Sequence, residues 1–82
     1  MKEFIIAYDI VDKKRLNKIS KYLEKECMRI QYSIYYIKTK KEVLKAIIDN
    51  LIELMEVDDD IRIYRVDMKK SLFLKNDIRL VI

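Results

Sequence analysis

The chain has no glycine and no proline in its 82 residues. These two residues make many tight turns, because glycine tolerates left-handed backbone angles and proline fixes one angle in advance. Every turn must therefore be made by Asp, Asn, Ser or Lys, and no flexible linker or low-complexity segment divides the chain. We predict one compact domain over residues 1–82.

Charge is divided unevenly along the chain. Residues 13–41 contain ten Lys or Arg residues and two acids, whereas residues 49–60 contain six acids and no base. The basic half would attract a polyanion and the acidic segment would repel one. This division is typical of a protein that orients a nucleic acid or a charged partner, and two solvated helix faces of opposite sign explain it equally well.

The composition excludes several kinds of chemistry. The chain has no histidine and a single cysteine, Cys27, which rules out a Ser-His or Cys-His catalytic pair, an internal disulfide and a zinc site. Catalysis would have to use carboxylates, tyrosines, lysines, arginines or an oxygen-ligated metal. No apolar run is long enough to span a membrane and no signal-peptide pattern is present, so we expect a soluble, cytoplasmic protein.

The first amphipathic helix is predicted to begin after Asp12, whose side chain is a suitable N-cap. Leu16, Ile19 and Leu23 recur at helical spacing and form the stripe that would face the core. The opposite face is basic, and a solvated face and a ridge that follows phosphates are equally good explanations of it. Its lysines are Lys14, Lys18, Lys21 and Lys25.

The second helix is predicted from Lys40 to Met55. Its start, Thr39-Lys40-Lys41-Glu42, has the sequence of a capping box, in which the Thr and Glu side chains bond to free backbone N–H groups. Apolar residues then recur on one broad stripe. They are Val43, Leu44, Ile47, Ile48, Leu51, Ile52 and Met55.

Strands are predicted at Lys2–Ile10, Met28–Lys38 and Asp60–Val66, which are rich in Ile, Val, Tyr or Phe. The first is apolar on both faces, so it should be central in the sheet. The second is interrupted by Gln31-Tyr32-Ser33, which would fold it into a hairpin. The resulting order is that of a ferredoxin-like α+β sandwich, βαββαβ, with both helices on one face of an antiparallel sheet.

An extra C-terminal strand is predicted at Ile78–Ile82, after Ser71–Leu74 and a turn at 75–77. A bare apolar edge of this kind would promote aggregation unless it were paired. Pairing with the sheet of a second copy across a two-fold axis is the simplest solution. We therefore expect a homodimer whose contacts include Ile78, Leu80 and Ile82.

Asp9 is the acid that ends the apolar run from Phe4 to Tyr8. One carboxylate is a poor magnesium site, but a two-fold axis would supply a second Asp9. In the alternative interpretation, Asp9 accepts backbone N–H bonds in the loop before the first helix. The residues alone favour neither interpretation.

Other candidate residues also have two explanations. Four tyrosines lie beside the basic segments, where they would either stack on nucleic acid or be half-buried sheet residues with a solvated hydroxyl. They are Tyr8, Tyr32, Tyr35 and Tyr36. The acids at 56–60 lack the glycine and the spacing of a calcium loop, so a solvated turn is the better interpretation.

Three ordered blocks of the sequence stand out, and they are Tyr8-Asp9-Ile10, then Asp12-Lys13-Lys14-Arg15-Leu16-Asn17-Lys18-Ile19, then Arg29-Ile30-Gln31-Tyr32-Ser33-Ile34-Tyr35. Together these blocks resemble the CRISPR-associated protein 2 family. They are similar to the family's strand ending in Tyr-Asp-Ile, its Lys-Arg-Arg-Asn-Lys-Val helix start and its Arg-Val-Gln-Tyr-Ser-Val-Phe strand. The chain departs from that pattern at Leu16, Cys27, Tyr35 and Tyr36, where the family often has Arg, Gly, Phe and an acid.

The resemblance implies a homodimer that serves in CRISPR spacer acquisition, held between dimers of the integrase subunit, CRISPR-associated protein 1. It implies binding of double-stranded DNA and, in some members, magnesium-dependent cleavage of RNA or DNA. By motif the magnesium ligand and catalytic acid falls on Asp9. The basic and polar residues that by motif would contact nucleic-acid phosphate or shape the site are Arg15, Asn17, Lys18 and Arg29. To these we add Tyr8 and Tyr35, from their position beside the basic segments, as candidate nucleic-acid contacts.

Three other functions stay open at this point. The chain could be a purely structural DNA scaffold without catalysis, or a VapD-type ribonuclease toxin on a similar fold. A small-ligand regulatory domain is a further alternative, and the basic first helix argues against it.

Overall fold

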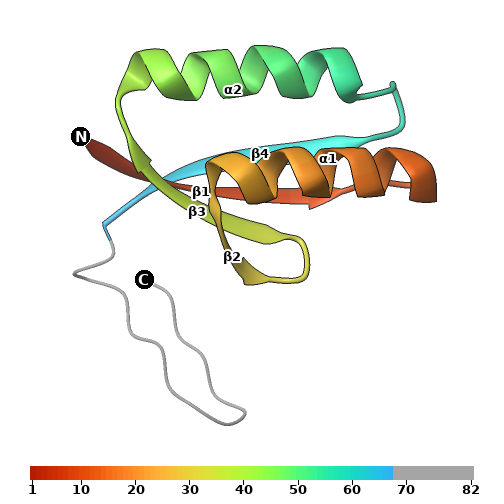
Figure 1. Cartoon of the computed structure of the whole chain (residues 1–82), viewed down its shortest axis with the longest axis horizontal. Coiled ribbons are helices and arrows are strands. Elements are labelled where there is room, and N and C mark those ends of the chain that lie inside the picture. The colour runs from red at the N-terminus through yellow and green to blue at the C-terminus, as the bar shows by residue number, and fades with distance from the viewer. Residues whose placement is uncertain (68–82) are drawn as a thin grey trace, which may run out of the picture.

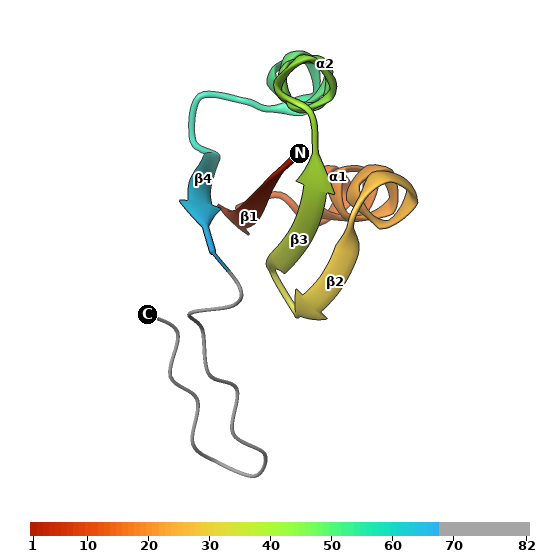
Figure 2. The ribbon, with the colours of Figure 1, turned by 90° about the vertical axis from the view of Figure 1, so that its left-hand side faces the viewer.

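The computed structural model describes residues 1–67. The elements run β1 (Lys2–Asp9), α1 (Lys13–Glu26), β2 (Met28–Gln31), β3 (Ile34–Thr39), α2 (Lys41–Leu54) and β4 (Asp60–Val66). The strands form one antiparallel sheet in the order β2-β3-β1-β4. Both helices lie on the same side of this sheet (Figures 1 and 2). The predicted βαββαβ sandwich is confirmed.

Successive side chains along β1 point to opposite faces of the sheet. Phe4, Ile6 and Tyr8 are buried towards the helices, whereas Ile5 is half-buried and Asp9 is exposed on the opposite side. Because β1 pairs with β3 on one edge and β4 on the other, it is the central strand that its apolar composition predicts. The core therefore lies between the helices and one face of β1.

The start of α1 agrees with the sequence prediction. The Asp12 side chain accepts a hydrogen bond from the backbone N–H of Arg15 at 2.9 Å, which satisfies one of the free donors of the first turn. Ile19 and Leu23 are fully buried. At the other end the N–H of Cys27 bonds to the Leu23 carbonyl at 2.7 Å with an extended backbone, so the helix ends without a left-handed residue.

The start of α2 differs from the prediction. Thr39 is the buried last residue of β3, paired with Lys2, and the N-cap position belongs to Lys40, whose side chain makes no capping bond. The predicted capping box is wrong, because pairing in the sheet fixes the position of Thr39. The apolar stripe is also narrower than predicted, since Val43 and Ile52 are exposed.

The hairpin predicted within residues 28–38 is confirmed. Strands β2 and β3 are joined at Tyr32 and Ser33, with Gln31 paired to Ile34, and the register shifts between Arg29 and Gln31. Within residues 1–67 no helix has the length and apolar character needed to cross a bilayer. The predicted terminal strand, with Ile78, Leu80 and Ile82, lies outside the described residues.

Candidate functional site

Asp9 lies exposed at the end of β1, directly opposite Asp60, the first residue of β4. Residues that face each other on antiparallel strands project from the same face, with Cβ atoms about 5 Å apart. Both carboxylates therefore lie on the side of the sheet that carries no helix. We call this side the helix-free face. The Asp60 carboxylate also accepts a hydrogen bond from Arg62 Nε at 3.1 Å, and both side chains are largely exposed.

The pairing with Asp60 was missed at the sequence level, where the acids at 56–60 are interpreted as a turn. Two signals could have found it. The alternation in the predicted strand turns Ile61 and Ile63 towards the core, so Asp60 must point the other way. The ferredoxin-like order then places this strand beside β1, antiparallel, with its start next to Asp9.

The alternative interpretation of Asp9, as an acceptor of backbone N–H bonds, is not supported. Within the described part of the chain, the Asp9 carboxylate has no hydrogen bond or ion pair. The loop donors next to it are instead satisfied by Asp12, which accepts from Arg15 N, and by Asp59, which accepts from Val11 N at 3.4 Å. Asp9 is therefore free to meet a ligand from solvent.

Asp9 and Asp60 would supply only some of the six ligands that a magnesium ion needs. Residues 1–67 contain no group of three or more His, Cys, Asp or Glu side chains placed to hold a metal. Magnesium, however, is commonly bound by one or two carboxylates, with water and substrate phosphate oxygens completing the octahedron. The donor set of one chain therefore fits a magnesium ion that a phosphate substrate helps to hold.

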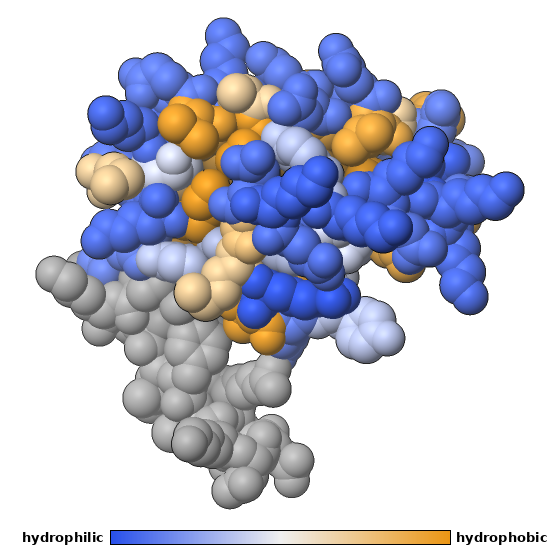
Figure 3. All heavy atoms as spheres, in the orientation of Figure 1, coloured by the Kyte–Doolittle hydropathy of each residue, from blue (hydrophilic) through white to orange (hydrophobic). Residues whose placement is uncertain are grey.

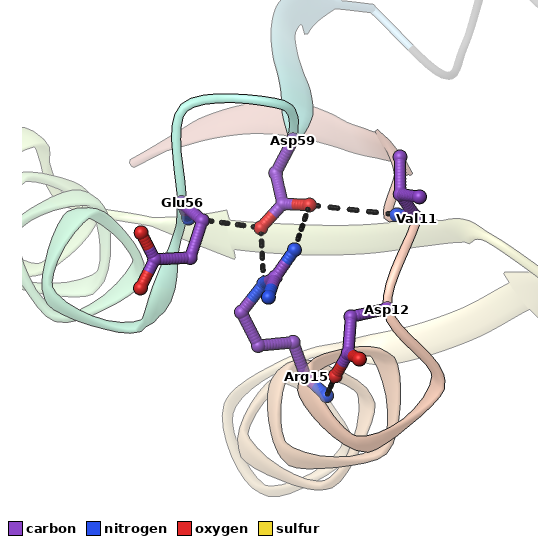
Figure 4. A network of polar contacts seen from close by, with 5 residues as sticks. All are labelled: Val11, Asp12, Arg15, Glu56 and Asp59. Atoms are coloured by element: carbon purple, nitrogen blue, oxygen red, sulfur yellow. Dashed lines mark hydrogen bonds and ion pairs between the residues drawn. The ribbon is translucent and has the colours of Figure 1, made fainter.

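A buried carboxylate connects the two loops behind this pair (Figure 4). Asp59 accepts from Arg15 Nε at 2.7 Å and Arg15 Nη2 at 3.0 Å. It also accepts from the backbone N–H of Glu56 at 2.9 Å and, at 3.4 Å, from that of Val11. Its side chain is 0% exposed. These four hydrogen bonds, which we call the Asp59 clamp, join the β1–α1 loop to the α2–β4 loop.

The clamp shifts the pKa values of both of its charged side chains. The Arg15 guanidinium and the Glu56 N–H hold the pKa of Asp59 down at about 2, and Asp59 in turn raises the pKa of Arg15. The Arg15 side chain is 26% exposed, and its Nε and Nη2 atoms point at Asp59. Phosphate binding by Arg15 stays a prediction, and the structure places this residue in a structural ion pair.

Tyr8 and Tyr35 lie together in the core on the helix side of the sheet. Their ring centroids are 6.0 Å apart, and Tyr35 is 0% exposed. The Tyr35 hydroxyl is 3.0 Å from Ser20 Oγ on α1, and burial raises the pKa of the Tyr8 hydroxyl. Both residues fit the interpretation of buried sheet tyrosines with satisfied hydroxyls.

Arg29 lies on the surface and holds the β2–β3 turn. Its Nη2 donates to the Tyr32 carbonyl at 2.8 Å and its Nη1 donates to Glu24 Oε1 at 3.2 Å. Its guanidinium lies 5.3 Å from the ring centroid of Tyr32 and 5.8 Å from that of Tyr35. A cation in this position is attracted to both aromatic faces.

The predicted nucleic-acid residues are thus only partly brought together. Tyr8, Asn17 and Arg29 line one cavity of about 370 Å³ between α1 and the hairpin. Lys18 is exposed on α1 and does not line it. Hydrophilic side chains lie over α1 in the view of Figure 3, and the lysines of its predicted basic face, Lys14, Lys18, Lys21 and Lys25, are all exposed.

The helix-free face also carries apolar surface. Ile5 pairs with Tyr36 on one side and Tyr64 on the other, and Tyr64 is 49% exposed. The Tyr36 hydroxyl donates to Glu3 at 2.6 Å, and this bond raises the pKa of Tyr36. Aromatic and aliphatic side chains therefore share the helix-free face with the Asp9 and Asp60 carboxylates, four residues further along the same two strands.

The sequence matches the family described as CRISPR associated protein Cas2 over residues 1–72. It is 40% identical, over 65 residues, to a Nitrosomonas europaea protein named CRISPR-associated endoribonuclease Cas2 1. That match covers 78% of this chain and 62% of the relative, so the chain spans less than two thirds of the relative's length.

Solved structures agree in fold. Cas2 from Streptococcus pyogenes superposes with a TM-score of 0.69 at 22% identity, covering 76% of this chain and 82% of that one. A chain in a structure described as a partial Cas6-RT-Cas1–Cas2 complex has a TM-score of 0.69 at 30% identity and covers 88% of this chain and 89% of its own length. The family match over residues 1–72, together with the Nitrosomonas relative, shows that this chain belongs to the CRISPR-associated Cas2 family.

Proposed function

We propose that this chain is a homodimeric, cytoplasmic nucleic-acid-binding subunit of a CRISPR spacer-acquisition complex, with a magnesium-dependent phosphodiesterase site at Asp9. Support for the activity comes from the Nitrosomonas relative, which is named an endoribonuclease. Support for a Cas1 partner comes from the related chain in a complex described as containing Cas1 and Cas2. Double-stranded DNA and single-stranded RNA are both candidate ligands.

The observation that carries the activity is the placement of Asp9 and Asp60 as exposed register partners on the helix-free face. In this proposal Asp9 and Asp60 hold a magnesium ion from one side and leave the other side to phosphate oxygens. When bound, the ion would supply a Lewis acid and lower the pKa of a water molecule, which a chain without histidine needs. The Asp59 clamp joins the two loops that adjoin these acids, one after Asp9 and one before Asp60.

The homodimer is supported by the apolar part of the same face. Ile5 and Tyr64 lie next to each other on the helix-free face and Tyr64 is 49% exposed. A second copy that covered this face would bury these side chains and bring a second Asp9 towards the first. Ile78, Leu80 and Ile82 remain predicted contacts of the dimer, and the mass of the chain in solution without residues 78–82 tests them: an unchanged dimer would contradict that prediction.

The activity is tested with Asp9→Asn and a matched control, Asp58→Asn, which removes an exposed acid from the α2–β4 loop. Asp9→Asn should abolish magnesium-dependent cleavage of RNA and DNA substrates while the dimer and nucleic-acid binding remain. Asp58→Asn should cleave like the wild type. Cleavage retained by Asp9→Asn would show that the activity does not reside at this acid.

A structural scaffold without catalysis is the second candidate, favoured by the absence of a third metal-ligating side chain near Asp9 within residues 1–67. In that case Asp9→Asn should support spacer integration as the wild type does, and no purified preparation should cleave. A pull-down with Cas1 separates both candidates from a toxin of the VapD type, which would not bind the integrase subunit.

A further inference from the structure

The cavity between α1 and the β2–β3 hairpin has no part in the proposed Asp9 site. Its volume is about 370 Å³, and its walls include Tyr8, Asn17, Lys21, Arg29 and Tyr32. Since Tyr8 and Asp9 are neighbours on a strand, their side chains point to opposite faces of the sheet. The cavity therefore opens on the helix side, away from the two carboxylates.

Tyr32 stands at the tip of the hairpin with an exposed ring on a fixed backbone. The residue is 87% exposed, yet its carbonyl accepts hydrogen bonds from Tyr8 Oη at 3.3 Å and from Arg29 Nη2 at 2.8 Å. The Arg29 guanidinium also lies 5.3 Å from the ring centroid. A core tyrosine and a surface arginine thus hold the turn from two sides, which lowers the entropy lost when a ligand meets the ring.

The charges around the cavity favour an anionic ligand. Lys21 lines it from α1, and the positive charge of Arg29 is shared with Glu24 at 3.2 Å. Lys18 and Lys25 are exposed on the same helix and add to the positive field. A nucleotide has a flat base that can stack on an aromatic ring and a phosphate that is attracted to lysines. Proteins that bind single-stranded nucleic acid combine these two interactions.

The exposed Tyr32 ring also favours unpaired over paired nucleic acid. In a duplex each base is stacked and paired inside the helix, so its face cannot reach a protein side chain unless it is unstacked. An unpaired base has a free face that an exposed aromatic ring can cover. Tyr32 is therefore suited to an overhang or a single strand, whereas the outward lysines serve any phosphate backbone.

We propose that Tyr32 and the adjoining cavity bind an unpaired nucleotide, with the base stacked on the Tyr32 ring and the phosphate near Lys21. This inference deepens the proposed function and rests on nucleic acid being the ligand of the chain. The single strand would then bind on the helix side of the sheet, whereas Asp9 lies on the helix-free face.

The test compares the affinity of the full chain for a single strand of about 12 nucleotides and for the blunt duplex of the same sequence. Tyr32→Ala should weaken binding of the single strand by roughly 10-fold, the order expected for one lost base stack, and change duplex binding by less than about 2-fold. Tyr32→Phe keeps the ring and should bind like the wild type. Fluorescence anisotropy measures all of these affinities.

Val57→Ala is the control, because it removes an apolar side chain that is 96% exposed in the α2–β4 loop and that lies neither on the helix-free face nor in the wall of the cavity. It should leave single-strand affinity unchanged. Unfolding curves of all variants check that the fold is kept, as expected for a side chain as exposed as Tyr32.

The outcomes separate this inference from the proposed function. If the wild type binds neither oligonucleotide, the proposed function itself fails. If it binds both and Tyr32→Ala has no effect, or weakens both equally, the site at Tyr32 is overturned while nucleic-acid binding stands. An equal loss in Val57→Ala would also overturn it, because the effect would then not be specific to the hairpin.

Discussion

Arg15 donates two hydrogen bonds, at 2.7 and 3.0 Å, to the Asp59 carboxylate, which solvent does not reach. Asp9 ends its strand two residues before Val11, another donor to this carboxylate, and Asp60 directly follows Asp59. The positions of the two acids on the helix-free face are therefore connected to one buried charge. Any change to that charge should affect both stability and the separation of the two acids.

Replacing Asp59 by Asn should destabilise the fold. The Asn side chain keeps the shape but removes the charge, so Arg15 loses its ion pair and part of the hydrogen bonding becomes mismatched. We expect the melting temperature to fall by roughly 5 °C or more for a domain of this size. The control is Asp58→Asn, an exposed neighbour whose melting temperature should stay within about 2 °C of the wild type.

The effect of Asp59 should depend on pH in a defined direction. Its pKa is about 2 in the folded protein, below the ordinary value of 3.8, so the folded state binds this proton less readily than the unfolded chain. The stabilisation is complete above the ordinary pKa and is lost as the pH falls through about 2. The difference in melting temperature between wild type and Asp59→Asn should therefore be constant above pH 5 and shrink towards pH 2. A difference that persists undiminished at pH 2 would show that the charge of Asp59 is not its source.

Asp60 should contribute to the binding of a divalent cation next to Asp9. As a ligand of the ion, Asp60 would lie closer than about 6 Å, the distance at which one charge attracts a dication in water by about 1.4 kcal/mol, so removing its charge lowers affinity by at least about 10-fold. We expect Asp60→Asn to weaken Mn²⁺ binding, measured by calorimetry, by that factor. Asp60→Glu keeps the charge and should lose less. Equal affinity in Asp60→Asn and the wild type would contradict a shared site.

The basic face of α1 should govern the salt dependence of nucleic-acid binding. If Lys18 and Lys21 each neutralise one phosphate, the double change to Gln should make the slope of log K against log salt shallower by about 2. The matched control is Lys41→Gln with Lys45→Gln on α2, where both lysines are exposed. The control pair should leave the slope unchanged, and an unchanged slope in the α1 pair would support a merely solvated face.

Cys27 should be a slow nucleophile. Burial, with a smaller contribution from the Glu26 carboxylate, raises the pKa of its thiol to about 11 from an ordinary 9.0. The thiolate fraction at pH 8 is then about 100-fold lower than for an ordinary cysteine. Because a thiolate of higher pKa is also the stronger nucleophile, its reaction with a disulfide reagent at pH 8 should be slower by roughly 10-fold, and unfolding in guanidinium should restore the ordinary rate. A fast reaction in the folded protein would contradict the burial of this thiol.

The features predicted correctly from the sequence depend on residues near each other in the chain. Asp12 caps α1 through an N–H only three residues away, and Ile19 and Leu23 follow the helical period. The hairpin turn at Tyr32 is equally local. Such patterns can be recognised from the sequence, because a short stretch of backbone fixes the relative positions of the residues that interact.

The features missed depend on pairing across the fold. Asp59 and Arg15 are 44 residues apart, and Asp60 faces Asp9 only because β4 pairs with β1 in that register. Thr39 was predicted to cap a helix from a local sequence pattern, but it instead pairs with Lys2 in the sheet. Local preference is a weak guide wherever a tertiary contact competes for the same residue.

The alternation of β1 has a consequence for genetics. Tyr8 and Asp9 are adjacent in the chain, yet one supports the hairpin cavity and the other stands on the helix-free face. A mutation that keeps the buried Tyr8 ring in place therefore need not disturb the surface around Asp9. Under the proposed function, Tyr8→Phe, which keeps the buried ring and removes only the hydrogen bond to the Tyr32 carbonyl, and Asp9→Asn should give separate defects, the first at the hairpin and the second in magnesium-dependent cleavage.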